Sequence, residues 1–351
     1  MEPLAAIITT VYNTGQYLED CLESALSQRT NFPFVLIVSE DCGKDNSREI
    51  IKRYKKKFPL TSSVQGTKGK GFVPFIVDCS PSKNMGLVPN SYWCLSQALS
   101  LGVKYVSFLD SDDIITDVYK LQDQVNFLEK NPEYQMVYSD NIYIGADIGY
   151  SQAVTLAKQT PYKHSGARLT AAYETHYSPE FEDSGITLKS LLTSNNPCVA
   201  GAACFRTENL SFFPMAVGDT KNFVTQDLPV WLELLKYGKI AKEKKVTFAY
   251  RDLTESWSRS ADIEKIERFQ RGSMDVRNSF IARQDYTESE KKNLTAASEK
   301  FYYGKMLRAY AKNAPEKYFK FVCEALKKYP ALLFANDFWR AAGIRIKKII
   351  S

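Results

Sequence analysis

The residues best suited to chemistry form an acidic cluster in "YVSFLDSDDII", residues 105–115. Asp110, Asp112 and Asp113 follow directly after an apolar run. Burying carboxylates without a partner is unfavourable. The cluster therefore either lies on a solvated turn or faces a positive charge. Carboxylates spaced D-x-D after a strand can hold a hard cation such as Mg²⁺ or Mn²⁺, with water and phosphate oxygens completing its coordination.

Two earlier segments also place polar residues where an apolar run ends. "TTVYN" ends in Asn13, and "VSEDCGKDNS" contains Glu40 and Asp41. A carboxylate at such a position can accept hydrogen bonds from a base or a ribose. For Asp45 and Ser47 we favour a plain role as caps of the following helix.

Alternating strands and helices must position these residues. The pattern predicts strands over 4–12, 32–41, 72–79 and 104–110, and helices over 15–28, 45–58 and 91–102. Strands separated by helices of this length indicate βαβ units and a mostly parallel sheet. In such a sheet ligands bind at the carboxyl ends of the strands. The polar residues at 13, 40–41 and 110–112 should therefore meet along one edge.

The second half of the chain is predicted to be less regular. We expect a helix over 117–132, strands over 133–144, 197–206 and 245–251, a helix over 226–238, and only helices beyond about 260. Residues 145–196 are polar with weak periodicity, which is typical of a disordered segment or a functional lid. Within them, "ETHYSPEFEDSG" could shape an acceptor site or be an ordinary surface loop.

Composition excludes several classes of protein. The chain has 351 residues, enough for one large or two ordinary domains, and its 44% hydrophobic and 25% charged residues are typical of globular proteins. The net charge of +6 is dispersed, which argues against a nucleic-acid binder. Seven cysteines without a CxxC pair and two histidines argue against zinc and disulfides, and favour a reducing cytoplasm. The first residues lack the pattern of a secretory leader, and no run approaches the roughly 20 apolar residues of a membrane span.

The segment "FWRAAGIRIKKIIS", residues 338–351, mixes large apolar residues with four cations and no acid. Such a helix could bind an anionic membrane surface, which would place the protein at the inner face of the membrane. The alternative is a helix that packs its apolar face on the core.

The ordered combination of these motifs resembles family 2 glycosyltransferases, over roughly residues 4–255. "TTVYNTGQYLEDCLESALSQ" is similar to the family's first strand–helix pattern, "VSEDCGKDNS" to its V-D-D-G-S-x-D-N-S pattern, and "FLDSDD" to its metal motif. The resemblance implies a GT-A fold, that is, an α/β fold with a Rossmann-like, mostly parallel sheet flanked by helices and, here, a helical C-terminal extension. It assigns 1–258 to the glycosyltransferase domain, with the nucleotide-sugar half over 1–115 and the acceptor half over 116–258, and 259–351 to the extension.

The resemblance also implies roles for single residues. It gives nucleotide-sugar binding to these positions: Thr9, Val11, Tyr12, Glu40, Asp41, Asn84, Gly86, Asp110, Ser111 and Arg251. Asp41 would contact a uracil-type base, and Asp110 and Asp112 would hold Mn²⁺ or Mg²⁺. Glu40 and Cys42 stand where the family normally has Asp and Gly, and Asn84 could instead cap a turn.

The segment "FVTQDLPVWLELLKYGKI" resembles the family's E-D-x-x-x-W-L-x-L pattern. Asp227 then matches the general base that removes the proton of the acceptor hydroxyl, and Gln226 replaces the usual Glu. A carboxylate at a helix start could also only stabilise the helix dipole. "AYRDLTESWSRS" resembles the family's ending on the diphosphate side, with Ser256 and Ser258 as candidates and Arg259 as a candidate or a solvated surface residue.

The resemblance therefore implies an inverting, metal-dependent hexosyl- or N-acetylhexosaminyl-transferase. It would move a sugar from a nucleotide-sugar, with UDP expected as the nucleotide, to a free or lipid-linked glycan, as similar proteins do in bacterial surface polysaccharide assembly. Two alternatives remain: a degenerate nucleotide- or glycan-binding protein, and a sugar-phosphate nucleotidyltransferase. The latter normally has an N-terminal Gly-rich loop, which "IITTVYNTGQY" lacks.

Overall fold

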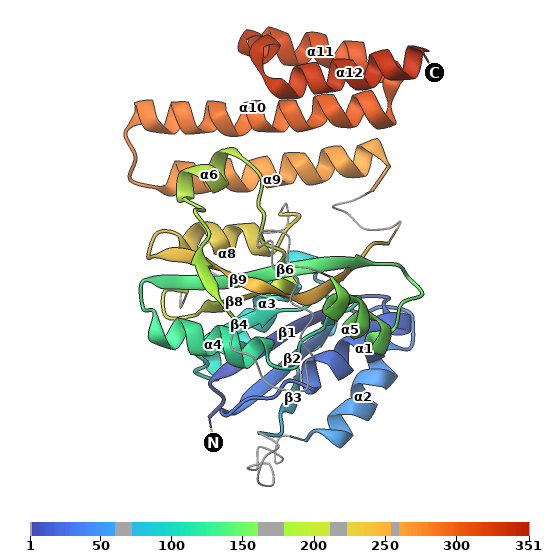
Figure 1. Cartoon of the computed structure of the whole chain (residues 1–351), viewed down its shortest axis with the longest axis vertical. Coiled ribbons are helices and arrows are strands. Elements are labelled where there is room, and N and C mark those ends of the chain that lie inside the picture. Colours follow the sequence, from blue (N-terminus) through green and yellow to red (C-terminus); the bar gives the residue numbers. More distant parts are fainter. Residues whose placement is uncertain (1, 60–71, 161–178, 211–222, 254–259, 351) are drawn as a thin grey trace. The chain divides into compact units, whose positions relative to one another are not determined.

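The computed structural model describes residues 2–59, 72–160, 179–210, 223–253 and 260–350 (Figure 1). The chain divides into two compact units. The first, here called the sheet unit, comprises residues 1–187, 196–221 and 233–252. The second, the helical unit, comprises residues 188–195, 222–232 and 253–351.

Four parallel strands form one half of the sheet, in the order β3-β2-β1-β4. They are β1 (Ala5–Val11), β2 (Phe34–Glu40), β3 (Phe75–Asp78) and β4 (Tyr105–Phe108). The helices α1 (Gly15–Leu26), α2 (Ser47–Lys57) and α3 (Leu87–Ser100) connect them. These are the strands and helices that the sequence predicts, and their order makes β1 the central strand of this half.

The other half of the sheet has mixed direction and continues in the order β8-β6-β9-β5. Its strands are β8 (Ala203–Arg206), β6 (Tyr134–Ile144), β9 (Lys239–Arg251) and β5 (Ile114–Ile115), and β7 (Phe181–Asp183) pairs with β9. Strand β8 runs antiparallel to β4 and β6, β5 and β7 run antiparallel to β9, and only β6 and β9 pair in parallel. The parallel expectation thus fits the first half of the sheet better than the second.

Both faces of the parallel half are buried. Alternate residues of β1 and β2 pack against α1, α2 and α4 (Lys120–Lys130) in one apolar cluster. The intervening residues, such as Ile8 and Ile37, are also buried, and α3 packs against β1 and β2. We infer that α3 covers the opposite face. Burial on both faces explains why these strands are nearly continuous apolar runs in the sequence.

The prediction of irregular structure over 145–196 is wrong for its described part. This part contains α5 (Tyr150–Gln159), β7 and α6 (Leu188–Thr193), whereas 161–178 lie outside the described residues. Helix α5 buries only Ala153 and Ala157, four residues apart. Such small side chains give a weak hydrophobic period, so the sequence pattern does not reveal this helix.

The helical unit has its own apolar core. It contains α6, the first residues of α8 (Asp227–Leu234), α9 (Ile263–Arg283), α10 (Glu288–Asn313), α11 (Pro315–Lys328), the short 3₁₀ helix η4 (Pro330–Phe334) and α12 (Asn336–Ile350). Asp262 caps α9 by accepting the backbone N–H groups of residues 264 and 265, and Thr287 and Glu290 form a capping box at α10. Tyrosines and aliphatic residues of α10 and α11 fill the core.

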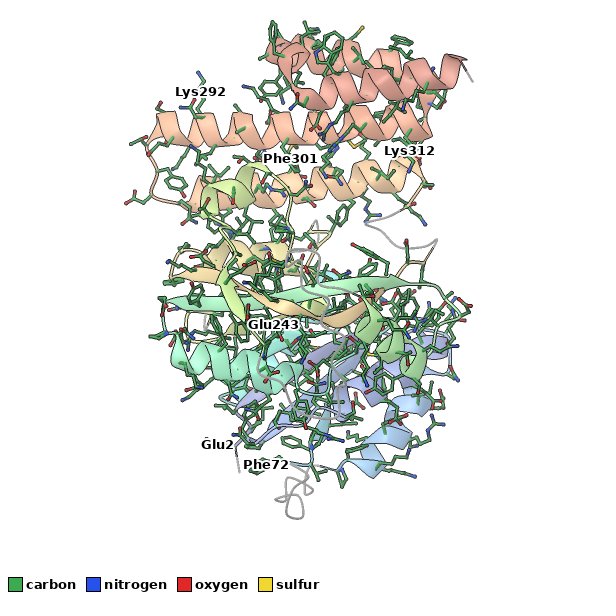
Figure 2. The ribbon with its side chains drawn as sticks, in the orientation of Figure 1. Glu2, Phe72, Glu243, Lys292, Phe301 and Lys312 are labelled. Carbon is green, nitrogen blue, oxygen red and sulfur yellow. The ribbon has the colours of Figure 1, made fainter. Side chains whose placement is uncertain are left out.

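The sheet unit buries charged side chains in its interior. Glu243 on β9 (Figure 2) is fully buried. Its carboxylate accepts a 2.8 Å hydrogen bond from Gln124. Burial raises the pKa of Glu243 to about 8. Burial likewise lowers the pKa of Lys120, whose ammonium group donates to Ser107, to about 8. Both groups are therefore held partly neutral near physiological pH.

Candidate functional site

Hydrogen bonds join the loops that follow β1 and β2. Asn13, with a left-handed backbone (φ 53°), accepts the backbone N–H of Lys44 at 2.7 Å. The carboxylate of Asp45 accepts the backbone N–H groups of Gly15, at 2.7 Å, and of Ser47. Burial opposes ionisation of Asp45, but these hydrogen bonds outweigh it and lower its pKa. The N-cap residue of α2 is Asn46, not Asp45 or Ser47, and its side chain makes no capping hydrogen bond. Asp45 supports the start of α2 from the preceding position and also ties this start to the β1 loop.

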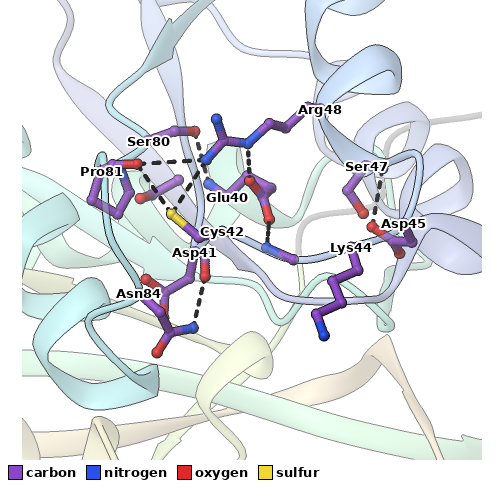
Figure 3. Close-up of polar contacts among 12 residues, drawn as sticks. Glu40, Asp41, Cys42, Lys44, Asp45, Ser47, Arg48, Ser80, Pro81 and Asn84 are labelled. Carbon is purple, nitrogen blue, oxygen red and sulfur yellow. Dashed lines mark hydrogen bonds and ion pairs between the residues drawn. The ribbon is translucent and has the colours of Figure 1, made fainter.

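The loop after β2 is joined to the segment before α3 through Asp41. One carboxylate oxygen of Asp41 accepts the backbone N–H of Met85 at 2.7 Å, and the other accepts that of Gly86 at 2.8 Å. The Asn84 side chain donates to the Asp41 carbonyl at 2.7 Å (Figure 3). Gly86 has a φ of 84°, which favours glycine. Three residues with predicted donor contacts, Asp41, Asn84 and Gly86, therefore form one compact turn.

The two departures from the family pattern in this loop have local explanations. Cys42 adopts a φ of 60°, the conformation for which glycine is usual, and Arg48 extends over it toward its sulfur at 3.4 Å (Figure 3). Glu40 is almost fully buried, and its carboxylate accepts the Gly43 backbone N–H and the Arg48 guanidinium. Arg48 thus supplies a positive charge and a hydrogen bond to the buried carboxylate of Glu40, which stands where the family has the shorter Asp. Sequence reasoning missed Arg48, because nothing in the pattern links it to Glu40.

The acidic loop after β4 connects to the same edge through Thr14 and Ser111. Their hydroxyl groups lie 2.7 Å apart, so the β1 loop and the "DSDD" loop are in direct contact. Ser111 and Asp113 are buried, whereas Asp110 and Asp112 are partly exposed. The loops that follow β1, β2 and β4 and the segment before α3 therefore form one connected edge, as the topology predicts. Thr14 was not identified from the sequence.

Arg251 holds the acidic loop from behind. Its backbone N–H donates to the Asp113 carboxylate at 2.7 Å, and its guanidinium donates to the Asp112 carbonyl at 2.7 Å. The same guanidinium donates to carbonyls of residues 145, 146 and 148 and lies 4.6 Å from the ring centre of Tyr17. Arg251 is only 1% exposed. These contacts show that Arg251 positions the acidic loop. Its direct contact with a nucleotide-sugar stays a prediction.

The three residues predicted to flank the nucleoside differ in exposure. Thr9 and Val11 point into the core from β1 and are 0% and 1% exposed, whereas Tyr12 is 54% exposed. Only Tyr12 therefore presents its side chain at the surface.

The carboxylates of the acidic loop are chemically suited to a cation. Burial raises the pKa of Asp112, against the lowering effect of Arg251. Burial, followed by the charges of Asp112 and Asp110, raises the pKa of Asp113 strongly. Among the described residues no group of three or more His, Cys, Asp or Glu side chains forms a complete metal site. Two carboxylates fit Mg²⁺ or Mn²⁺ when water and a diphosphate supply the other ligands.

Asp227 is the first residue of α8 and belongs to the helical unit. Its carboxylate accepts the hydroxyl of Thr225 and the backbone N–H of Leu228, the latter at 2.8 Å. Arg277 on α9 is buried and donates to the carbonyls of Leu191 and Ser194. Burial lowers the pKa of Arg277 to about 10, and the charge of Asp227 opposes that effect. Arg277 was not identified from the sequence.

Three further candidates, Ser256, Ser258 and Arg259, lie outside the described residues.

Residues 6–179 match the model of the family described as Glycosyl transferase family 2. The chain belongs to this family. The protein TuaG of Bacillus subtilis, provisionally named as a glycosyltransferase of teichuronic acid biosynthesis, is 30% identical over 32% of this chain and 37% of TuaG. Glycosyltransferase GlyG of Streptococcus pneumoniae is 29% identical over 33% of each chain. The chain therefore spans about a third of the length of these relatives.

Two solved structures have a similar fold over almost the whole of this chain. S. aureus TarS 1-349 in complex with UDP-GlcNAc has a TM-score of 0.54 and 16% identity, over 98% of this chain and 91% of that chain. The mannosyltransferase PcManGT from Pyrobaculum calidifontis, in complex with GDP-Man and Mn²⁺, has a TM-score of 0.52 and 12% identity, over 98% and 85%. The predicted GT-A fold with a helical C-terminal region is confirmed.

Proposed function

We propose that the protein is an inverting, metal-assisted glycosyltransferase that moves a sugar from a UDP-sugar to a hydroxyl of a glycan acceptor. The observation that carries the proposal is the connected edge formed by the loops around Asp41, Ser111 and Asp112. This edge joins the 84–86 turn, whose backbone N–H groups donate to the Asp41 carboxylate, to the acidic loop after β4. Both lie at the carboxyl ends of parallel strands. That is where α/β sheets bind nucleotides.

The acidic loop would hold the cation through Asp110 and Asp112. A bound divalent cation supplies charge stabilisation to the departing nucleoside diphosphate. Ser111 anchors the loop through Thr14, and Arg251 fixes the Asp112 carbonyl, so the two carboxylates keep a defined spacing. Burial raises the pKa of Asp112 and so disfavours its ionised form. A bound cation would offset this penalty.

The base side would use Tyr12 and the Asp41 turn. Tyr12 offers an exposed ring for stacking on a base, and its neighbour Asn13 fixes the loop to Lys44. The Asp41 carboxylate holds the 84–86 turn, whose exposed groups would contact the donor. Thr9, Val11 and Glu40 would then act from the core, by shaping the loops rather than by touching the base.

Asp227 would act as the general base. A carboxylate that removes the acceptor proton allows direct attack at the anomeric carbon, which inverts its configuration without a covalent intermediate. The charge of the Arg277 guanidinium interacts with that of Asp227, so the base would face a cation of the same unit. We place the donor half at 1–115, the acceptor half at 116–258 and the helical extension at 259–351, as the sequence predicts.

The comparisons support a UDP-sugar and a surface polysaccharide as the reactants. TarS was crystallised with UDP-GlcNAc, and the name of TuaG refers to teichuronic acid. A hexosyl- or N-acetylhexosaminyl-transferase of cytoplasmic location, acting on a free or lipid-linked glycan, is the corresponding proposal for this chain.

One observation favours the alternative of a nucleotide- or glycan-binding protein without catalysis. The Asp227 carboxylate accepts hydrogen bonds from Thr225 and Leu228, which would also suit a purely structural role at the start of α8. Nothing in the connected edge favours a nucleotidyltransferase.

A screen of nucleotide-sugars for metal-dependent hydrolysis tests the proposal. We expect UDP to raise the melting temperature only when Mn²⁺ or Mg²⁺ is present, because binding to the folded state stabilises it. Asp227→Asn should keep this shift and lose about 10²–10⁴-fold in turnover, the usual contribution of a general base. Asp285→Asn, an exposed substitution in the helical unit, is the matched control. Full turnover in Asp227→Asn would overturn the assignment of the base, and a UDP shift without metal would overturn the role of the acidic loop.

A further inference from the structure

Helix α12 has two apolar faces of different kinds. One face packs on the core of the helical unit through Ala341, with Phe338 and Ile344 partly buried beside it. On the other face, Trp339 and Ile346 are 63% and 56% exposed. They are seven residues apart and therefore lie on the same side of the helix. Packing on the core accounts for the first face but not for the second, where Trp339 stays exposed although its ring lies edge-on to that of its neighbour Phe338, at 5.5 Å between centroids.

Cations accompany this exposed face. Arg340 and Lys347 directly follow Trp339 and Ile346, have the same spacing and are exposed. Residues 315–351 contain eight lysines and arginines against three acids, so they carry five of the six net positive charges of the whole chain. Just before the helix, Phe334 is 89% exposed. No helix in the described part of the chain is long and apolar enough to span a bilayer.

We propose that this face of α12, together with Phe334, binds the surface of an anionic lipid bilayer. Aromatic side chains favour the headgroup region, and lysines beside them gain from the negative surface potential. A lipid surface is favoured over a protein partner because residues 315–351 carry five net positive charges, which match an anionic surface. The face forms the cationic amphipathic helix of a peripheral protein and holds the helical unit at the membrane. It does not depend on the donor chemistry proposed above.

Vesicle flotation of the full chain without nucleotide tests the proposal. We expect the protein to float with phosphatidylglycerol–phosphatidylcholine vesicles and to stay in the bottom fraction with pure phosphatidylcholine. Arg340→Gln with Lys347→Gln should weaken the partition roughly 30-fold, from two cations near an anionic surface. Trp339→Ser with Ile346→Ser should abolish flotation. All four positions are exposed, so unchanged melting temperatures should accompany these losses.

Two matched controls distinguish this face from general charge and hydrophobicity. Lys52→Gln with Lys56→Gln removes two exposed cations from α2, and Leu156→Ser removes an exposed apolar side chain from α5. Both should float as the wild type does. Absence of flotation in the wild type would overturn the proposal. So would a dimer that Trp339→Ser with Ile346→Ser dissociates while vesicles remain unbound, because the face would then be a protein interface.

A separate observation concerns two thiols beside the connected edge. The sulfur atoms of Cys79 and Cys94 lie 3.7 Å apart, without a bond between them. Cys79 is partly exposed directly after β3, whereas Cys94 is buried in α3. The hydrogen bond with Cys94 lowers the pKa of the Cys79 thiol against the effect of burial. Of these two thiols, Cys79 is therefore the one that reacts first with an oxidant.

We infer that Cys79 and Cys94 form a reversible disulfide when the protein meets a peroxide. The Cys79 thiolate attacks one peroxide oxygen, which gives a sulfenic acid and one molecule of water or hydroxide. The Cys94 thiol then attacks that sulfur, the S–S bond forms and a second water leaves. The sulfurs must approach to about 2.05 Å. The new bond would tie α3 to the chain that leads to Asn84 and Gly86, and so change the turn held by Asp41.

Thiol counting after treatment with hydrogen peroxide tests this inference. The wild type should lose two thiols and regain them with dithiothreitol, and Cys323→Ala, which removes an exposed thiol of α11, should lose the same two. Cys94→Ala should form no intramolecular disulfide. A wild type that forms no bond between 79 and 94, shown by peptide mass mapping, would overturn the inference.

The effect on the site rests on the proposed function and has its own readout. We expect the oxidised protein to bind UDP at least threefold more weakly or more tightly than the reduced protein, with no such change in Cys94→Ala. Equal affinities in an oxidised, mapped sample would overturn the link to the site. Failure of UDP binding in the reduced protein would instead contradict the proposed function.

Discussion

Two acidic loops at the same edge of the sheet differ in how far the protein itself offsets the charge of their carboxylates. After β2, the carboxylates of Glu40 and Asp41 accept hydrogen bonds from backbone N–H groups and from Arg48. After β4, burial raises the pKa of both Asp112 and Asp113, although Arg251 lies behind them. The first loop satisfies its charges within the protein. The second keeps an electrostatic cost that a bound cation would remove.

The difference shows why equal residue types can have unequal roles. A carboxylate that accepts two backbone N–H groups fixes the conformation of a turn, because losing the bonds leaves buried donors unpaired. A carboxylate penalised by burial gains free energy when a cation arrives. We therefore expect substitutions after β2 to affect mainly stability, and substitutions after β4 to affect mainly the response to metal.

Among substitutions in the two loops, the largest expected effect is that of Asp112→Asn. Removal of one of two carboxylates for the cation should lower turnover roughly 10³-fold, since a polarising cation contributes several kcal/mol. The metal-dependent shift of melting temperature by UDP should disappear as well. Titration with Mn²⁺, followed by thermal denaturation with and without UDP, measures both. A variant that keeps a normal Mn²⁺ response would remove the proposed contrast between the two loops.

Arg251→Met should reduce stability and also impair the acidic loop. Its guanidinium donates to the carbonyls of Asp112 and of residues 145, 146 and 148, and the methionine leaves these buried acceptors unpaired. We expect the free energy of unfolding to fall by about 3–4 kcal/mol, as for other broken buried ionic contacts. Urea denaturation measures the loss. The apparent Mn²⁺ affinity of the folded fraction should fall too, whereas a donor-binding role alone would leave stability unchanged.

Asp41→Asn should have a smaller and different effect. The asparagine keeps one acceptor oxygen, but its amide group faces the N–H of either Met85 or Gly86, so one donor is left unpaired. This should lower the free energy of unfolding by about 2 kcal/mol. UDP stabilisation, although weaker, should still require Mn²⁺. Loss of the metal requirement here would show that the two loops do not act separately.

The sequence predicts the first half of the fold well because burial and connectivity determine it together. Strands β1, β2 and β4 are apolar runs buried on both faces, and right-handed crossovers must bring their carboxyl ends to one edge. The positions of Asp41 and Asp112 follow from this topology. Helix α5 was missed because its buried face consists of two alanines.

The detailed roles were harder to predict because they depend on tertiary contacts. Arg251 appears in the sequence as a cation at the end of a strand, which suits a diphosphate. Its burial against residues 145–148 becomes visible only when β9 lies beside the acidic loop. Arg48 and Thr14 likewise gain their roles from partners that are distant or irregularly spaced in the sequence.

The pH dependence of stability gives the finest test of the contrast, through Asp113→Asn. Burial, and then the charges of Asp112 and Asp110, raise the pKa of Asp113 in the folded state well above its unfolded value of 3.8. A raised pKa means that the folded state binds the proton more tightly. The stabilisation is complete below the unfolded pKa and is lost as pH rises toward the folded pKa.

The asparagine keeps an oxygen that can accept the Arg251 backbone N–H, but it does not titrate. Without metal, Asp113→Asn should therefore gain stability over the wild type as pH rises from about 4, by up to about 1.4 kcal/mol per pH unit. The gain should stop once pH exceeds the folded pKa of Asp113. Urea denaturation at a series of pH values measures it, with the exposed Asp285→Asn as the control. A difference independent of pH would mean that Asp113 is not the charge that burial penalises in this loop.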